Sequence, residues 1–212
     1  MADSNGPLSG VKVIELAHVM AGPVCGLMLA DMGADVIKVE IPGKGDDTRG
    51  FAPPYLKDGE GKDTDQSAYF TCANRNKRSI AIDIQHADGQ ALLRDMAAKA
   101  DAVIENLKVG PLARLGLGYD DLKVVNAGLS YCSIAGTGQD GPYANRAGYD
   151  FQIQGMGGIM SLTGVPDGEP MKVGVAISDI MCGMYASNAI LAALHHKTAT
   201  GQGQYIDMAL LD

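Results

Sequence analysis

The stretch VKVIELAHVMAGPVCGLMLADMGADVIKVE, residues 11–40, decides the fold of this chain. Its first six residues form a short β-rich run, and Pro23 is suited to the first position of a helix expected to run to about Met32. Gly33 ends that helix, and residues 34–40 form a second β-rich run. The order strand, turn, helix, strand predicts a right-handed crossover unit of a parallel sheet.

The alternation of strands and helices continues along the rest of the chain. Residues 41–66, rich in Gly, Pro, Asp and Lys, are predicted to form a long surface loop. Two short helices are expected within residues 110–125, separated by Gly116 and Gly118. Further strands are predicted over 79–83, 101–105, 129–134 and 205–211, and helices over 87–100 and 180–196. This pattern predicts an α/β fold with an open, Rossmann-like parallel sheet and flanking helices, whose ligands lie beyond the carboxyl ends of the strands.

The composition is that of a globular protein and disfavours polyanionic partners. The chain has 212 residues, of which 46% are hydrophobic and 20% are charged, which favours a packed core over disorder. It has 17 basic and 25 acidic residues, a net charge of −8, so nonspecific attraction to nucleic acid or to an anionic membrane is unfavourable. No nucleic-acid or membrane partner is expected.

The cysteines and the chain start favour a cytoplasmic protein. Because no C-x-x-C is present, the four cysteines predict neither a metal site nor a dense disulfide framework, and reduced thiols are the default. Residues 1–10 lack the basic and apolar regions of a signal peptide. The most apolar window, residues 177–194, is interrupted by Asp179, Ser187 and Asn188, which makes it a poor membrane span.

One glycine motif is rejected as a nucleotide site. Residues 136–141 match G-x-G-x-x-G after a predicted strand. The dinucleotide fingerprint requires a helix to begin at once in the first crossover unit, but Pro142 follows the last glycine and the chain continues as loop to Gly148. The sequence therefore does not predict a dinucleotide cofactor.

Local chemistry leaves Asp179 with two alternatives. It precedes the long helix, where an Asp is a preferred N-cap, and it follows the apolar, strand-like residues 173–177, where an ionised carboxylate could attack an activated carbonyl. His18, in the turn after the first strand, is at a ligand-facing position. His195 and His196 are expected to complement the carboxyl end of the long helix.

Several stretches in the same order resemble the class III CoA-transferases, the CaiB/BaiF family, which includes formyl-CoA transferase, carnitine CoA-transferases and α-methylacyl-CoA racemases. The resemblance covers nearly the whole chain. Its anchors are residues 8–16, 21–23, 29–40, 45–49, 74–79, 100–106, 148–150, 163–168, 174–179 and 200–204. It implies the large, CoA-binding domain of that fold, and it implies that Asp179, which ends the GVAISD stretch, is the nucleophile.

The resemblance also implies a CoA site and no metal. It places His18, Met20 and Ala21 near the pantetheine and thiol. The residues that it places near the adenine and phosphates are Ile82, Asp83, Ile84, Gln85, Asn106, Leu107, Lys108 and Arg114.

Two departures from the family pattern concern polar contacts. Met20 stands where a relative has Gln, and Ile41 lies near the position of an Arg that contacts phosphate. The basic residues that could supply that charge instead are Lys38, Lys44, Arg49, Lys77 and Arg78.

The resemblance implies an acyl-CoA:carboxylate CoA-transferase. Racemases of the family carry His before the Asp of the G-x-D motif, whereas this chain has Tyr149, and a phenol is a poor base at neutral pH. Tyr149 is therefore expected to line the acyl part of the CoA thioester site, and transfer is favoured over racemisation. The alternatives are an α-methylacyl-CoA racemase or epimerase and a CoA-binding module without catalysis. The acid stays open among succinate-like, carnitine-like and oxalate-like compounds.

Chain length carries a further expectation. Family members are about twice as long, with a small second domain, a C-terminal segment that returns to the first domain, and protomers interlocked as ring-like dimers. The resemblance therefore implies that residues 1–212 form the N-terminal part of the large domain, that the rest is absent, and that the longer protein is an interlocked homodimer.

Overall fold

The computed structural model describes residues 6–212, so the first half of the N-terminal segment in which no signal peptide is predicted lies outside the described residues. Six parallel strands form one sheet in the order β5-β2-β1-β6-β7-β8. The strands are β1 (Lys12–Glu15), β2 (Asp35–Glu40), β5 (Arg78–Ala81), β6 (Ala102–Glu105), β7 (Ser130–Ala135) and β8 (Tyr205–Ala209). This order confirms the predicted open, parallel α/β sheet, and it shows that the strand order reverses between β1 and β6.

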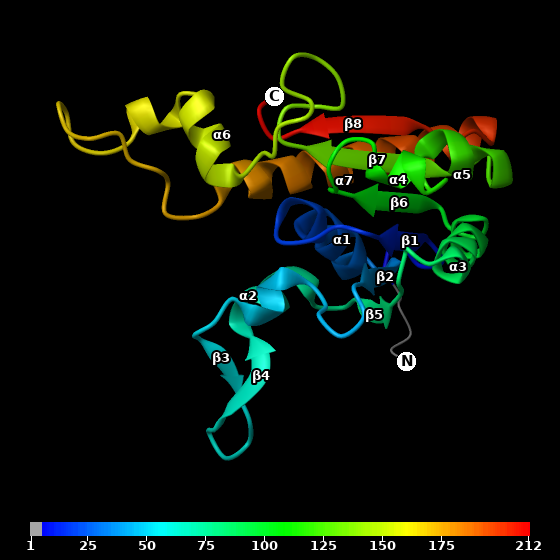
Figure 1. Cartoon of the computed structure of the whole chain (residues 1–212), viewed down its shortest axis with the longest axis horizontal. Helices are drawn as coiled ribbons and strands as arrows, with labels where there is room; N and C mark the ends of the chain where they lie inside the picture. The colour runs from blue at the N-terminus through cyan, green and yellow to red at the C-terminus, as the bar shows by residue number, and fades with distance from the viewer. Residues whose placement is uncertain (1–5) are drawn as a thin grey trace.

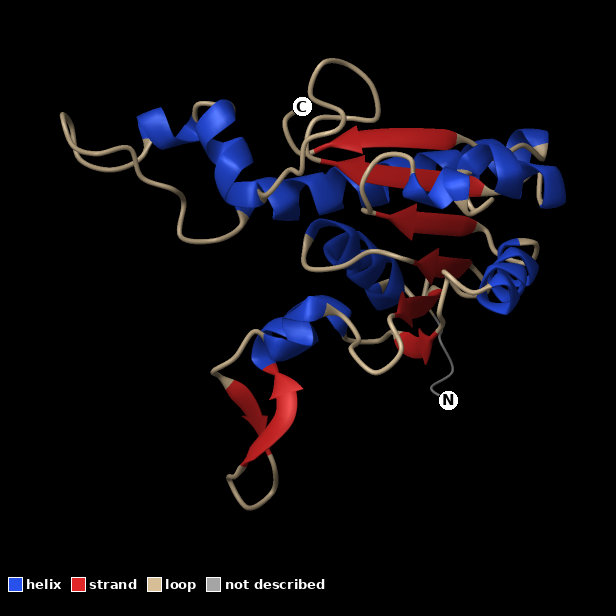
Figure 2. Ribbon diagram, in the orientation of Figure 1, coloured by secondary structure: helices blue, strands red, loops and turns tan. Residues whose placement is uncertain are grey.

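Helices cover both faces of the sheet (Figures 1 and 2). On one face lie α1 (Ala21–Asp31) and α7 (Ile177–Thr200), and on the other lie α3 (Ala87–Ala97), α4 (Pro111–Arg114) and α5 (Tyr119–Val125). Successive strand residues alternate between the two cores, since Val13 belongs to the first and Ile14 to the second. Two hydrophobic layers therefore hold the sheet between its helices.

The prediction that residues 41–66 form a loop is wrong in part. This segment contains a short 3-10 helix (Asp47–Gly50) and a hairpin of β3 (Tyr55–Lys57) and β4 (Asp63–Ser67), which pair with each other and not with the main sheet. Helix α2 (Ala68–Asn74) follows, and the Ser67 hydroxyl caps its start. Because β4 reads Asp-Thr-Asp-Gln-Ser, it lacks the apolar alternation that indicates a strand.

Several helix boundaries also differ from the prediction. Helix α1 begins at Ala21, so Pro23 is its third residue, a position whose N–H would have no helical partner. The apolar residues 173–177, which look strand-like in sequence, form no strand, and α7 begins at Ile177. A short helix, α6 (Asp150–Met156), and a 3-10 turn (Ile159–Leu162) were not predicted. In Figure 1 the segment carrying α6 extends beyond the sheet, on the side toward which the β6, β7 and β8 arrows point.

Helix α7 is long and apolar enough to cross a membrane by length and composition alone, with a mean hydropathy of 1.4 over an 18-residue window, whereas the sequence pattern predicts a poor membrane span here. In the fold, however, its inner face belongs to the core through Cys182, Ala186 and Ile190. The core helix of an α/β layer can meet the same criteria, but only 39% of this window is buried, and Met181, Met184 and Tyr185 are exposed on its other side.

The close approach of α1 and α7 requires Gly183. A Cβ atom at this position would lie 2.6 Å from the carbonyl oxygen of Ala21 and 2.9 Å from the side chain of Val24. Replacing Gly183 with Ala is expected to lower the free energy of unfolding by about 2 kcal/mol, because overpacking exceeds the gain of about 1 kcal/mol in helix propensity.

Urea denaturation followed by circular dichroism measures this loss. Gly59→Ala is the matched control, since a Cβ atom there meets nothing within 4 Å. Equal stability of the Gly183 variant and the control would contradict the packing argument.

Candidate active site

The loops that follow β1 and β6 meet where the strand order reverses. The Asn106 side chain joins them, since its Oδ1 accepts the N–H of His18 at 2.8 Å and its Nδ2 donates to the His18 carbonyl at 2.7 Å. These are adjacent strands whose connections leave toward opposite sides, which opens a crevice at their carboxyl ends. The structure therefore brings together two residues that the sequence placed in the CoA site.

The turn after β1 is held in an uncommon backbone conformation. Val19 has φ of +67°, which a β-branched residue adopts only under constraint. The Asp46 carboxylate accepts the Val19 N–H at 3.3 Å, and the Lys38 ammonium donates to the Ala17 carbonyl at 2.6 Å. Burial and the nearby Lys38 charge lower the pKa of His18, so His18 is neutral at pH 7. A rigid turn with a neutral imidazole thus borders the crevice.

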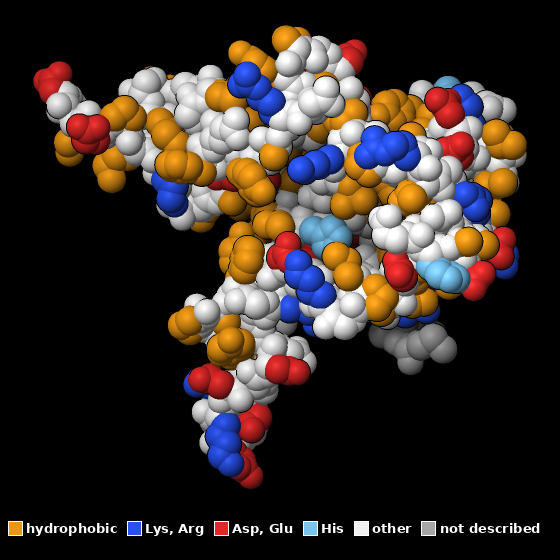
Figure 3. All heavy atoms as spheres, viewed as in Figure 1, with side chains coloured by type: hydrophobic (Ala, Val, Ile, Leu, Met, Phe, Trp, Pro, Cys, Tyr) orange, Lys and Arg blue, Asp and Glu red, His pale blue; other side chains and the backbone are white. Residues whose placement is uncertain are grey.

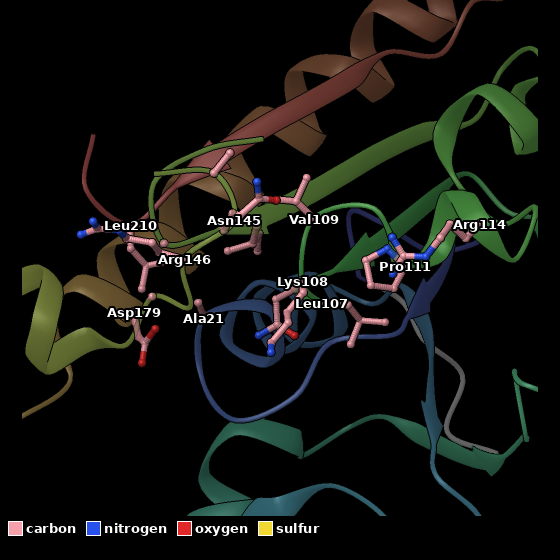
Figure 4. Close-up of a pocket in the computed structure, with 16 residues that line it drawn as sticks. Ala21, Leu107, Lys108, Val109, Pro111, Arg114, Asn145, Arg146, Asp179 and Leu210 are labelled. Atoms are coloured by element: carbon pink, nitrogen blue, oxygen red, sulfur yellow. The ribbon is translucent and has the colours of Figure 1, made fainter. Parts of the chain in front are cut away.

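A cavity extends along the crevice and joins six of the predicted site residues (Figure 4). Asp179 and Arg146 lie at one end, Lys108 and Leu107 in the middle, and Arg114 at the other end. The predicted residues among its lining are Ala21, Asn106, Leu107, Lys108, Arg114 and Asp179. A single elongated ligand could therefore contact a carboxylate at one end and a guanidinium at the other.

Asp179 lies in the first turn of α7 and does not act as its cap. The N-cap residue is Ala176, and the backbone N–H groups of Ser178 and Asp179 donate instead to Asp150 Oδ1, at 2.7 and 3.3 Å. Among the described residues, none donates a hydrogen bond to the Asp179 carboxylate. The interpretation of Asp179 as a structural N-cap is therefore wrong, and its carboxylate is left free for another role.

Burial makes the Asp179 carboxylate unusually basic. Desolvation, with a smaller contribution from the charge of Asp150, raises the pKa of Asp179 to about 7. Perturbed carboxyl groups in cavities are concentrated at functional sites, because basicity accompanies nucleophilic strength. The chemistry of this carboxylate suits attack on an electrophilic carbonyl.

A second, mostly apolar cavity meets the first at Asp179. It is lined by Met20, Val24, Tyr69, Cys72, Tyr149, Asp150, Phe151, Lys172, Gly174, Val175, Ala176, Asp179 and Ile180. In Figure 3 hydrophobic side chains gather on both sides of the notch between the α2 and α6 regions. Met20 and Tyr149, both predicted site residues, thus lie with Asp179 on the apolar side, so the carboxylate stands between a cationic and an apolar cavity.

The basic residues suggested as replacement phosphate contacts are engaged elsewhere. The side chains of Lys38 and Lys77 are buried and form ion pairs with Glu15, with Nζ–Oε distances of 2.9 and 2.7 Å. Arg49 binds Glu40 through two hydrogen bonds of 2.7 Å, which, despite burial, lower the pKa of Glu40 to about 2.

The remaining two candidates make exposed ion pairs, Lys44 with Asp47 and Arg78 with Asp35. In the described part of the chain, the cations that line the first cavity without an acidic partner are Lys108, Arg114 and Arg146.

Other predicted residues, including His18, lie outside both cavities. Ile82 is buried in the second core, and Asp83, Ile84 and Gln85 follow the edge strand β5 at the carboxyl side of the sheet. His195 and His196 lie before the last turn of α7, which ends at Thr200. Within residues 6–212, no group of three His, Cys, Asp or Glu side chains is placed to hold a metal ion.

Sequence reasoning missed Arg146, Asp46 and the pair Asp150 and Gln154. Asp150 belongs to the G-x-D motif and Asp46 to the GDDTR stretch, so both motifs were visible. What the sequence did not show is that Asp46 holds the turn of Val19 and that Asp150 holds the start of α7. Both contacts join segments far apart in the chain.

Comparisons with known proteins identify the family of this chain. The chain is 56% identical over its whole length to a succinate–glutarate CoA-transferase of Agrobacterium fabrum, and it covers 53% of that protein. It is 44% identical to a mouse succinyl-CoA:glutarate CoA-transferase, covering 99% of this chain and 46% of the relative. A crystal structure of a CaiB/BaiF family protein from Brucella suis superposes with a TM-score of 0.92 at 56% identity, covering 98% of this chain and 54% of that one.

The chain thus spans about half the length of the relatives it matches. The family described as CoA-transferase family III matches residues 8–212, which include both loops of the crevice and Asp179. By sequence and by fold, this chain belongs to CoA-transferase family III.

Proposed function

We propose that the protein transfers CoA from succinyl-CoA to a second dicarboxylic acid such as glutarate, with Asp179 as the nucleophile. The observation that carries the proposal is the position of Asp179 between an apolar cavity and a cavity lined by three cations that have no acidic partner among the described residues. The activities for which the two relatives are named supply the choice of acids. On this proposal, CoA lies along the first cavity and the acyl chain enters the second.

The first half of the reaction moves CoA onto the protein. A carboxylate oxygen of Asp179 attacks the thioester carbonyl carbon, the carbon–sulfur bond breaks, and CoA leaves as a thiolate from an aspartyl-acyl anhydride. The thiolate then attacks the Asp179 carbonyl carbon of the anhydride. The carbon–oxygen bond breaks, the acid departs as a carboxylate, and Asp179 carries CoA as a thioester.

The second half runs the same steps in reverse with the acceptor acid. Its carboxylate attacks the Asp179 thioester and releases the thiolate, and the thiolate attacks the acceptor's carbonyl to give the new acyl-CoA and free Asp179. Each step passes through an oxyanion. The N–H groups of Ala21 and Gly22, which have no partner within α1, stand at the helix start that lines the first cavity, so we assign them to this charge.

The side chain of Tyr149 supports transfer over racemisation. It is 69% exposed and lines the apolar cavity beside Asp179, at the position where racemases of the family carry a basic His. A racemase needs a base on each side of the substrate α-carbon, and a phenol serves that role poorly at neutral pH. Solvent deuterium in the α-position of recovered acyl-CoA, without an acceptor acid, would instead indicate racemisation.

Mass spectrometry of the protein incubated with a panel of acyl-CoAs tests the proposal. We expect a CoA-sized adduct on the peptide that carries Asp179, strongest with succinyl-CoA, and its loss when glutarate is added. Asp179→Ala is the matched control and should carry no adduct. Absence of an adduct with every donor, under conditions in which the protein binds CoA, would overturn the transferase proposal in favour of a CoA-binding module.

Arg114 is expected to contribute to CoA affinity and not to turnover. Its guanidinium lines the end of the first cavity opposite Asp179, so it suits a phosphate of CoA and is remote from the reacting carbonyl. Arg114→Ala should raise KM for the CoA thioester about tenfold, with kcat unchanged, as expected for loss of uniform binding.

Steady-state kinetics with succinyl-CoA as the varied substrate check this split. Lys62→Ala removes the same charge from the exposed end of the β3–β4 hairpin and serves as the control. A fall in kcat without a change in KM would place Arg114 outside the CoA-binding end.

Exposed apolar side chains support a proposed homodimer of the longer protein. They are concentrated on the segment around α6 and on the outer face of α7, and include Phe151, Leu162, Val165, Met181 and Tyr185. Such surfaces favour a protein partner. Light scattering during size-exclusion chromatography of the longer protein would measure its oligomeric state. A monomer at micromolar concentration would contradict the proposed homodimer.

A further inference from the structure

The amino-terminal turn of α7 is capped from another element. Asp150, the first residue of α6, accepts the N–H of Ser178 at 2.7 Å and the N–H of Asp179 at 3.3 Å through the same oxygen, Oδ1. The first N–H groups of a helix have no partner within it and carry partial positive charge. A carboxylate supplied by α6 therefore takes the donors that would otherwise stabilise an anion on α7 itself.

Gln154 fixes the second oxygen of Asp150. It is fully buried, one turn further along α6, and its Nε2 donates to Asp150 Oδ2 at 2.5 Å. Its Oε1 accepts the N–H of Val173 at 2.8 Å, which ties α6 to the segment leading into α7. Both oxygens of Asp150 are thus engaged, and the carboxylate cannot turn away from the start of α7 without breaking these bonds.

The consequence is an asymmetry between two neighbouring carboxylates. Asp150 has three hydrogen bonds, whereas the Asp179 carboxylate accepts none from the described residues. A carboxylate without donors keeps its electron pairs available and its basicity high, whereas donors would stabilise the anion and weaken it as a nucleophile.

We propose that Asp150, held by Gln154, is a positioning residue that keeps the Asp179 carboxylate reactive by occupying the helix-terminal N–H groups and by placing a second negative charge beside it. The inference rests on the proposed role of Asp179 as nucleophile. The charge of Asp150 is also one of the two causes that raise the pKa of Asp179 to about 7, after burial.

Other titratable groups face Asp179 from each neighbouring element. Tyr69 and Cys72 lie on α2, Cys182 lies one turn along α7, Tyr149 precedes α6, and Lys172 lies in the segment before α7. On the side of the first cavity are Lys108 and Arg146. Burial raises the pKa of the Tyr69 phenol and of the Cys182 thiol, which favours their neutral forms, and Asp150 is the carboxylate whose charge acts on Asp179.

The test is the titration of Asp179 in Asp150→Asn and Asp150→Ser. An Asn or Ser oxygen still accepts the helix N–H groups, but the charge is gone. Carbon-13 NMR of protein labelled at the Asp carboxyl carbons reports the titration directly, with the Asp179 signal identified by its absence from Asp179→Asn. We expect the midpoint to fall by about one pH unit in both variants, and the acid limb of the CoA-exchange rate to move with it.

A matched control removes the charge of a capping carboxylate at the start of another helix. Asp121 Oδ2 accepts the Gly118 N–H at 3.2 Å at the start of α5, and Asp121 lines neither cavity that contains Asp179. Asp121→Asn should leave the Asp179 midpoint and the exchange profile unmoved. Thermal unfolding verifies that each variant is folded. The amide group introduced by Asp150→Asn faces the Gln154 amide. If this contact prevents folding, the Asp179 midpoint is measured in Asp150→Ser instead.

The failures of the two ideas are distinguishable. If the unmodified protein forms no CoA adduct and exchanges no CoA, the proposed function fails and the role of Asp150 in it fails too. If it exchanges CoA but the Asp179 midpoint and the rate profile are the same in Asp150→Ser as in the unmodified protein, the proposed function stands and the inference about Asp150 is overturned.

Discussion

Replacing Asp179 with Asn is expected to abolish CoA exchange, with turnover falling about 10⁴-fold or more, because an amide cannot form the anhydride on which both proposed half-reactions depend. The substitution keeps the size of the side chain, so both cavities that meet at Asp179 keep their shape. Exchange of labelled glutarate into glutaryl-CoA, followed by chromatography, measures the rate. Asp95→Asn, an exposed carboxylate on α3, is the control and should retain full exchange. Appreciable exchange by the Asp179 variant would rule out covalent catalysis at this position.

The same variant should be more stable than the unmodified protein at alkaline pH. Since the pKa of Asp179 is raised to about 7 in the folded state, the native protein binds more protons than the unfolded chain between about pH 4 and pH 7. Its stability therefore falls as pH rises through that window.

Asp179→Asn removes this cost, which is about 2 kcal/mol above pH 7 after a discount for the partial exposure of the side chain. The stability difference should vanish near pH 4. An inactive but stabilised variant would show that the fold is intact and that the Asp179 carboxylate is held at an energetic cost.

The sheet could be predicted from sequence because its signals are local. Each strand is a short β-rich run next to a glycine or a polar turn, and each crossover helix follows within a few residues. The helix α6 carried no such signal, since its seven residues include Gly155 and follow a long loop. The hairpin of β3 and β4 was missed because its strands are polar.

The same difference between local and long-range signals applies to the candidate site. Asp179, Asn106 and Lys108 were placed by motif and resemblance, and the structure brings them to one cavity. The contacts that hold the site could not be predicted, because each joins distant segments. Asp150 reaches α7 across 28 residues, and Asp46 reaches the turn of Val19 across 27.

Lys38 shows the limit most clearly. In sequence it is one basic residue in the run DVIKVE, and it was a candidate phosphate contact. In the structure it is 1% exposed, and its ammonium contacts Glu15, Asp46 and the Ala17 carbonyl. A sequence pattern cannot distinguish an exposed lysine on a strand from one neutralised by carboxylates on other segments, because that difference depends on tertiary contacts.

Lys38→Met is therefore expected to lower the free energy of unfolding by about 3–5 kcal/mol, since it leaves Asp46 buried without its ammonium partner. Burial raises the pKa of Asp46, but the charge and hydrogen bond of Lys38, followed by the hydrogen bonds from Thr48, lower it to about 2. That contribution is present above about pH 4 and is lost as the pH falls toward 2. Urea denaturation at pH 7 measures the loss, and Arg78→Met, which breaks the exposed ion pair with Asp35, should cost under about 1 kcal/mol.

A double variant distinguishes the buried charge from lost packing. In Lys38→Met with Asp46→Asn, the single Asn oxygen can take the place of Asp46 Oδ1, which accepts the N–H of Thr48 at 2.9 Å and that of Val19 at 3.4 Å, and Glu15 keeps its partner Lys77. If the uncompensated charge of Asp46 dominates, the double variant should be more stable than Lys38→Met alone, by about 1–3 kcal/mol. If the double variant is no more stable than Lys38→Met alone, the ammonium stabilises the fold through its hydrogen bond to the Ala17 carbonyl, and this bond, and not the ion pair, holds the turn at the candidate active site.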